Sequence, residues 1–129
     1  MKLIVCLDQN NGLLFNRRRQ SRDRTVAQDI MSRLGSGRLW MHPYSASLFS
    51  QWEAQVSVAE DFLAQAGPED FCFLENAPQP TEAYDVIVYR WDRVYPADTT
   101  FDLSGLHLIG KEEFPGFSHD RITREVYVP

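Results

Sequence analysis

Near its N-terminus the chain reads LIVCLDQNNGLL at residues 3–14. The first five of these residues form an unbroken apolar run, and the stretch from Asp8 to Gly12 consists of residues that favour turns. The pattern therefore predicts a strand over residues 2–7 that stops at Asp8. A strand without a polar face is typical of a sheet that is covered on both sides. We expect this strand at the centre of the protein.

Downstream, short apolar runs alternate with segments of helical spacing. Ser21 is the expected N-cap of a helix over residues 22–34, and Ser45 is the expected N-cap of a second helix that contains Trp52. Further strands are expected at residues 38–41, 56–58, 71–74, 85–91, 106–109 and 123–128, with a short helix at 60–66. This alternation predicts a largely parallel sheet with helical crossovers, and the last two strands should form an antiparallel hairpin because no helix separates them.

Length and composition favour one domain. The chain has 129 residues, of which 43% are apolar and 24% charged, and these are ordinary values for a globular domain covering residues 1–129. No membrane span and no secretory signal pattern stand out, so the expected location is the cytoplasm. The histidines and cysteines are too scattered for a metal site. The net charge of −5 argues against a general nucleic-acid coat.

The order of these elements and two local patterns resemble the dihydrofolate reductase family over nearly the whole chain. Asp8, Asn10 and Gly12 match the family's D-x-N-x-G loop after the first strand. The stretch VIVYRWDRVYPADTTFD (residues 86–102) resembles a late strand and the family's acid-Thr-x-Phe pattern. The resemblance implies an α/β fold with one mixed sheet, mostly parallel, that ends in an antiparallel C-terminal hairpin and is flanked by helices. It also implies NADPH as a cofactor.

One departure from the family concerns the acid that handles the proton. The carboxylate that the family places in its first helix would fall near Val26 or Ala27, and neither residue is acidic. Asp23 and Asp29 flank this position, and Asp29 is the candidate catalytic residue. An Asp near the start of a helix also has a structural explanation, since it interacts favourably with the helix dipole. Folate reductase activity is therefore not expected.

Two further departures fall at the implied cofactor site. The family's Gly-Arg-x-Thr phosphate motif is replaced by MHPYS at residues 41–45, in which only the hydroxyl of Ser45 matches the motif in type. The family's Gly-Gly pair is replaced by ENAP at residues 75–78, where side chains and a proline should crowd a dinucleotide. The sequence therefore disfavours NADPH in its usual pose.

Arginines are concentrated just before the first helix, where the resembling family has a loop over its substrate pocket. Five of the eleven fall within eight residues: Arg17, Arg18, Arg19, Arg22 and Arg24. The planar donor fork of arginine suits phosphates and carboxylates, and a helix N-terminus also favours anions. We expect Arg17, Arg18, Arg19 and Arg22, together with Ser45, to bind a small anionic molecule or a nucleotide. The alternatives are pairing with acids of the chain, contact with a partner subunit in a homo-oligomer, and contact with RNA.

Three functional hypotheses remain open on the sequence. In the first, a repurposed reductase fold binds an anionic ligand in the old substrate cleft. In the second, an NADPH-dependent reductase holds its cofactor differently, with Ser45 and the arginines on the phosphates and Asp29 as the proton donor. The third is an RNA-binding or ribonuclease-related protein, because some short bacterial proteins that resemble this chain carry the name ribonuclease Z. That metallo-hydrolase family requires a His-x-His-x-Asp-His zinc motif, which this chain lacks.

Overall fold

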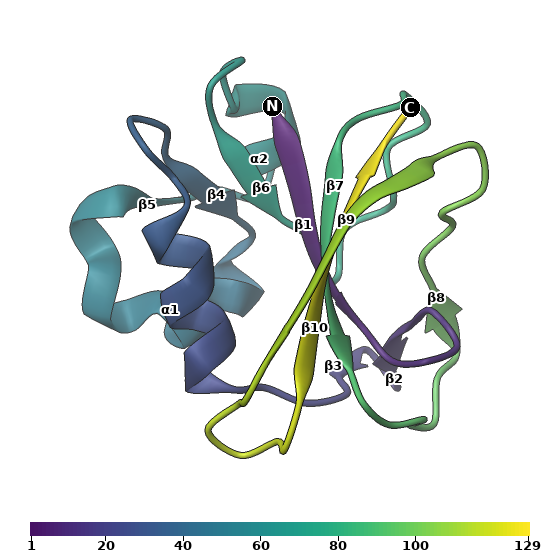
Figure 1. The fold of residues 1–129 in the computed structure, drawn as a ribbon. Coiled ribbons are helices and arrows are strands. Elements are labelled where there is room, and N and C mark those ends of the chain that lie inside the picture. The colour runs from purple at the N-terminus through teal and green to yellow at the C-terminus, as the bar shows by residue number, and fades with distance from the viewer.

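The computed structural model describes residues 1–129, which form two β-sheets and a few helices (Figure 1). The larger sheet contains β1 (Lys2–Leu7), β4 (Leu39–Met41), β5 (Val56–Val58), β6 (Phe71–Phe73), β7 (Val86–Trp91), β9 (His107–Phe114) and β10 (Ile122–Val128). Its strand order is β5-β4-β6-β1-β7-β10-β9. The strands from β5 to β7 are parallel, whereas β10 is antiparallel to both of its neighbours. The predicted mixed α/β sheet with an antiparallel C-terminal hairpin is confirmed.

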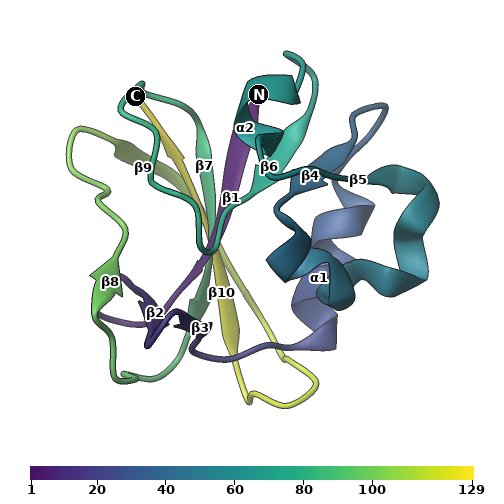
Figure 2. The same ribbon diagram turned by 180° about the vertical axis from the view of Figure 1, so that it is seen from behind.

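The first strand lies at the centre of this sheet, as its apolar sequence predicts. It pairs with β6 on one side and with β7 on the other. Because successive side chains of a strand point to opposite faces, Leu3, Val5 and Leu7 enter one core cluster and Ile4 enters another. One cluster lies under the helix α1 (Arg24–Ser32), and the other lies on the side of α2 (Phe62–Gln65), seen from behind in Figure 2. Both faces of the sheet are thus covered.

The two expected longer helices form, but their starts differ from the prediction. Asp23, not Ser21, caps α1, because its carboxylate accepts a hydrogen bond from the N–H of Thr25. The second segment is a kinked 3-10 helix, η1 (Pro43–Gln55), and His42 caps it in place of Ser45. Pro43 explains the earlier start, since proline suits the first turn of a helix.

A small second sheet was not expected from the sequence. It consists of β2 (Gly12–Phe15), β3 (Arg18–Arg19) and β8 (Thr99–Thr100), in the order β3-β2-β8. A two-residue turn, Asn16–Arg17, connects β2 to β3, and both residues have positive φ angles, 51° and 62°. This backbone is characteristic of the tight turns that join hairpin strands.

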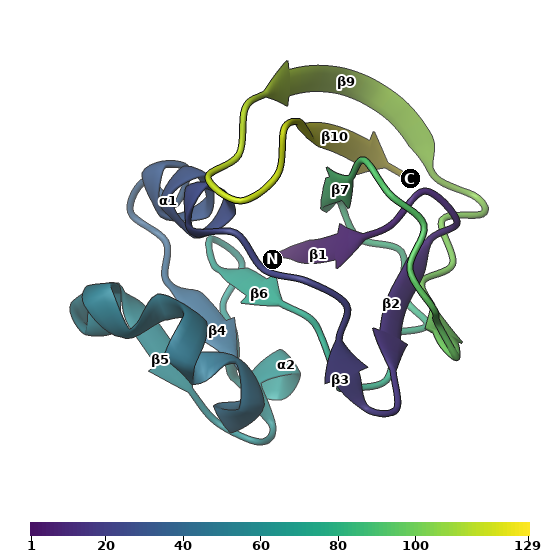
Figure 3. The ribbon, with the colours of Figure 1, turned by 90° about the horizontal axis from the view of Figure 1, so that it is seen from below.

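The loop between β9 and β10 reaches back to the start of α1, which Figure 3 shows from below. Residues 115–121 of this loop lie beside the chain that leaves β3 and enters α1, and Phe117 and Ser118 donate backbone hydrogen bonds to Asp23. Two segments nearly a hundred residues apart in sequence therefore form one surface. No helix of the protein has the length and apolar character that crossing a membrane requires.

Candidate functional site

A cavity of about 440 Å³ opens where α1, η1 and the β9–β10 loop meet. Apolar and polar side chains share its wall, and the apolar ones are Cys6, Val26, Ala27, Ile30, Leu48, Phe49, Phe73, Trp91 and Phe117. The central sheet provides the floor through β1, β6 and β7, whereas α1 and η1 provide the sides. The cavity suits a molecule of modest size that has both an apolar part and polar groups, because small-molecule sites are concave and combine apolar side chains with placed polar groups.

Two arginines lie at the rim of this cavity without a carboxylate partner. Arg22 is exposed, and its guanidinium takes part in none of the ion pairs of the protein. Arg24 also has no ion pair, and its guanidinium lies 4.0 Å from the centre of the Phe117 ring. Arg22 precedes α1 and Arg24 is its first residue, so the N-terminal end of the helix adds positive potential at the same place.

The acid Glu75 also lines the cavity, but its carboxylate is already bound. Arg19 approaches it at two points, with Nε 2.9 Å from Oε2 and Nη2 3.0 Å from Oε1. Ser45 is fully buried, and its hydroxyl donates to Oε1 of Glu75 at 2.7 Å. The Arg19 guanidinium also lies 4.6 Å from the centre of the Tyr44 ring. Arg19 and Ser45 are therefore committed to internal contacts just beyond the ends of β4 and β6.

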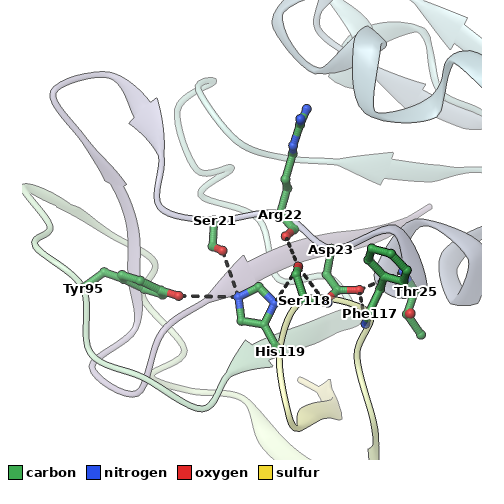
Figure 4. Close-up of polar contacts among 8 residues, drawn as sticks. All are labelled: Ser21, Arg22, Asp23, Thr25, Tyr95, Phe117, Ser118 and His119. Carbon is green, nitrogen blue, oxygen red and sulfur yellow. Dashed lines mark hydrogen bonds and ion pairs between the residues drawn. The ribbon is translucent and has the colours of Figure 1, made fainter.

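A second polar group faces the cavity at the start of α1 (Figure 4). The Ser21 hydroxyl lies 2.9 Å from Nε2 of His119, and Nδ1 of His119 lies 2.9 Å from Oδ2 of Asp23. Asp23 and His119 are both buried, whereas Ser21 is half-buried and lines the cavity. The three residues thus form a hydroxyl–imidazole–carboxylate chain whose hydroxyl end lies at the cavity.

Asp23 is held in the ionised form. Burial by itself would raise the pKa of this carboxyl group, but hydrogen bonds from the His119 ring and from the N–H groups of Phe117, Ser118 and Thr25 outweigh burial and leave its pKa well below the usual value. An ionised carboxylate accepts a hydrogen bond from the Nδ1–H group of His119, which leaves Nε2 as the acceptor facing Ser21. The pair therefore fixes the tautomer of the ring.

The environment of His119 fixes the orientation of its ring as well. The indole of Trp91 stacks on the imidazole, with ring centroids 4.6 Å apart and an angle of 23° between the planes. Gly116 allows the loop to close on Asp23, because a Cβ atom at this position would lie 2.6 Å from the Asp23 carboxylate. The Tyr95 hydroxyl is a more distant neighbour of Nε2, at 3.4 Å.

The structure places Asp29, the candidate proton donor, outside the cavity. Its carboxylate accepts hydrogen bonds from Tyr89 at 2.6 Å, from Arg33 at 2.9 Å and from Arg124 at 2.9 Å. Arg33 directly follows α1, Tyr89 lies on β7 and Arg124 lies on β10. Asp29 is thus part of a polar network that joins α1 to the sheet.

The remaining arginines of the cluster are separated from Arg22. Arg17 is at the tip of the β2–β3 turn, and Arg18 lines a different hollow together with Phe15, Tyr95 and other residues. The four arginines expected to bind one ligand therefore lie apart: Arg17 and Arg18 are away from the cavity, Arg19 is bound to Glu75, and Arg22 lines the cavity together with Arg24.

Sequence reasoning missed the contact between Ser21 and His119. The two residues are separated by 98 positions, and no spacing motif links them. A local signal was present only at one end, where Ser21 and Asp23 flank an arginine directly before a helix. At the other end, the histidines are considered only as metal ligands, and they are too scattered in the sequence for that role.

The comparisons with known proteins show a fold but no close relative. No protein-family model matches the sequence, and no curated protein matches it significantly. Among solved structures, a dihydrofolate reductase from Enterococcus faecalis, complexed with NADP(H) and RAB-propyl, superposes with a TM-score of 0.61 at 9% sequence identity. The match covers 98% of this chain and 94% of that chain. The protein therefore has a dihydrofolate reductase-like fold.

Proposed function

We propose that this protein binds a small anionic molecule with an apolar or aromatic body in the cavity beside the start of α1, and that it does not reduce dihydrofolate. The observation that carries the proposal is the guanidinium of Arg22, which has no carboxylate partner and lies at the rim of a cavity whose floor and one side carry apolar side chains. A carboxylate or phosphate is the partner that a guanidinium binds best.

The balance of charge around the cavity supports an anionic ligand. Four charged residues line it, Arg22, Asp23, Arg24 and Glu75. Both acids are satisfied from within the protein, Asp23 by His119 and the β9–β10 loop, and Glu75 by Arg19. The two arginines keep their charge available, so the cavity presents net positive charge to a ligand.

The side chains that α1 directs into the cavity argue against folate reduction. They are Arg24 at the first position of the helix and the apolar Val26, Ala27 and Ile30, and none of them is acidic. The family resemblance implies a carboxylate in this part of the helix, and no such group is present at Val26 or Ala27. Asp29 is held by Arg33, Arg124 and Tyr89 on another side of α1. A pteridine ring would therefore lack its acidic partner.

The residues at the ends of β4 and β6 do not fit NADPH in the pose that the family resemblance implies. A dinucleotide needs backbone that it can approach closely and donors for its phosphates. Here the buried carboxylate of Glu75 occupies this region, and the Ser45 hydroxyl donates to it. A phosphate placed here would meet the negative charge of Glu75, and the donor groups of Arg19 and Ser45 are already bound to that carboxylate.

A thermal-shift titration tests the proposal. The ligands are NADPH, NADP, dihydrofolate, nucleoside mono- and triphosphates, and aromatic carboxylates such as benzoate. A ligand that binds the native state raises the Tm with concentration, and at 100 times its Kd it adds about 2.7 kcal/mol of stability. We expect a saturable shift with at least one anion other than dihydrofolate, and a smaller shift for the Arg22→Gln variant.

Arg17→Gln provides the matched control, because it removes the same charge at the exposed tip of the β2–β3 turn, away from the cavity. The shift should survive this change. The proposal is contradicted if no anion of the panel raises the Tm, or if both variants weaken binding equally. A saturable shift with NADPH that is insensitive to Arg22→Gln would instead favour a reductase with an altered cofactor pose.

A further inference from the structure

We propose that Ser21, His119 and Asp23 form a nucleophile–base–acid triad that hydrolyses a small ester in the same cavity. We expect this ester to carry an anionic group, and that expectation rests on the proposed function. The assignment of the triad depends only on the geometry of the three residues. The two contacts of 2.9 Å join the three residues in the order that general-base activation of a serine requires.

The carboxylate end of the triad is rigid. Oδ1 of Asp23 accepts the N–H groups of Thr25 and Phe117, each at 2.9 Å, and Oδ2 accepts the N–H of Ser118 at 2.8 Å. With these donors in place the carboxylate keeps one orientation and one charge, and it can stabilise an imidazolium at His119 when the ring takes a proton. This is the function of the buried acid in a catalytic triad.

The imidazole is held for proton transfer at one nitrogen. Trp91 covers one face of the His119 ring, and Asp23 fixes the proton on Nδ1. The free pair on Nε2 then faces the Ser21 hydroxyl, within the range that a general base needs. Ser21 is the member of the triad that a substrate can reach, because it lines the cavity while His119 and Asp23 are buried.

Donors for a developing negative charge are present beside the nucleophile. The backbone N–H groups of Arg22 and Asp23 make no hydrogen bond within the protein. The N–H that follows a nucleophilic serine is a common donor to the oxyanion in hydrolases. The unpaired guanidinium of Arg22 lies at the same rim and can hold an anionic group of the substrate.

The reaction follows from these positions. Oγ of Ser21 bonds to the carbonyl carbon of the ester, its proton passes to Nε2 of His119, and the alcohol leaves with that proton as the carbon–oxygen bond breaks. Water then attacks the acyl carbon and gives a proton to His119. The bond to Oγ breaks, Ser21 recovers the proton, and the carboxylic acid departs. The only co-reactant is water.

A bland explanation of the same contacts also exists. Ser21 satisfies a buried acceptor on His119, and the His119–Asp23 pair ties the β9–β10 loop to α1. A purely structural hydroxyl would not react faster than any other serine of the protein. Covalent labelling separates the two explanations, because a fluorophosphonate reacts with activated serines by forming an Oγ–phosphorus bond and releasing fluoride.

The experiment treats the full chain with a fluorophosphonate probe, followed by intact mass and peptide mapping. We expect one label, on Ser21, which is lost in Ser21→Ala and slowed at least about 100-fold in His119→Gln. Ser47→Ala is the matched control, because Ser47 also lines the cavity but has no histidine within hydrogen-bond distance. Hydrolysis of p-nitrophenyl acetate should follow the same order.

The proposal is overturned if the folded protein takes no label while a serine hydrolase in the same tube is labelled. It is equally overturned if the label is on other serines or is insensitive to His119→Gln. If His119→Gln does not fold, the comparison of Ser21→Ala with the unmodified chain still decides, since the half-buried Ser21 tolerates alanine. The neutral probe does not need Arg22, so labelling without any anion-induced Tm shift would reject the proposed ligand class alone, and the reverse result would reject the triad alone.

Discussion

Arg19 and Glu75 form a two-point ion pair across 56 residues of sequence, and Glu75 is only 5% exposed. Removing one partner of a buried pair leaves the other charge without compensation. We predict that Glu75→Ala lowers the free energy of unfolding by about 3 kcal/mol, measured by urea denaturation.

The pair formed by Arg33 and Asp29 is the control for this prediction. Arg33 is 41% exposed and lies one helical turn from Asp29. Exposed pairs of this spacing contribute about 0.5 kcal/mol or less, so Arg33→Ala should have a small effect. Equal losses in the two variants would show that burial of Glu75 does not strengthen its pair.

The stability of the protein should fall in acid because of Asp23. Its folded pKa is depressed, so the unfolded chain takes up the proton first as the pH falls, and protonation pulls the equilibrium toward unfolding. The contribution is complete above the unfolded pKa of about 4 and is lost progressively below it. Asp23→Asn should be less stable at neutral pH and should lose less stability between pH 5 and pH 3. Urea denaturation across this range measures both effects, and identical slopes for the two proteins would contradict the assignment.

Arg17→Gly should stabilise the protein. Arg17 has a φ angle of 62°, which costs an ordinary residue about 1 kcal/mol or more and costs glycine little. The change also creates Asn-Gly, the preferred pair for this type of turn. The greater flexibility of glycine in the unfolded chain offsets part of this relief. We therefore expect a net gain of only roughly 0.5 to 1 kcal/mol in the free energy of unfolding, measured by thermal or urea denaturation. Arg18→Gly, in the adjacent strand β3, should show the opposite sign.

Asp29→Asn should affect stability but not the cavity. The Asp29 carboxylate balances Arg124, which is 8% exposed, and accepts the Tyr89 hydroxyl. Losing its charge should cost about 1 to 3 kcal/mol. Labelling at Ser21 and any anion-induced Tm shift should persist, because Asp29 does not line the cavity. Loss of either in a folded Asp29→Asn variant would bring Asp29 back as a catalytic candidate.

The sequence predicts the main sheet because its strands carry local signals. The apolar run at residues 3–7 and the alternation of β4, β5 and β6 with helices are enough to place β1 at the centre. The start of α1 was missed by two residues, since Ser21 and Asp23 both have capping side chains and only the tertiary contacts with the β9–β10 loop favour Asp23.

The candidate site was harder to predict because its contacts are long-range. The register of β10 against β7 determines where His119 lies, and no local pattern reports that register. The arginine cluster is visible in the sequence, but its division is not, because Arg19 is bound to a glutamate 56 residues away whereas Arg22 lines the cavity. The β2–β3 hairpin was missed for a different reason: its strands are very short, and its turn contains Arg17 where glycine is usual.

The side chains of Arg19, Glu75 and Ser45 fill the space just beyond the ends of β4 and β6. This limits the reactions that the fold can support. A reductase brings two large molecules together and therefore needs two entrances to one reacting centre. The Arg19–Glu75 pair and the Ser45 hydroxyl occupy the region where the family resemblance implies a dinucleotide, so a reaction that needs such a molecule there would have to displace them. Water needs no such space, and hydrolysis at Ser21 is therefore compatible with this filled region.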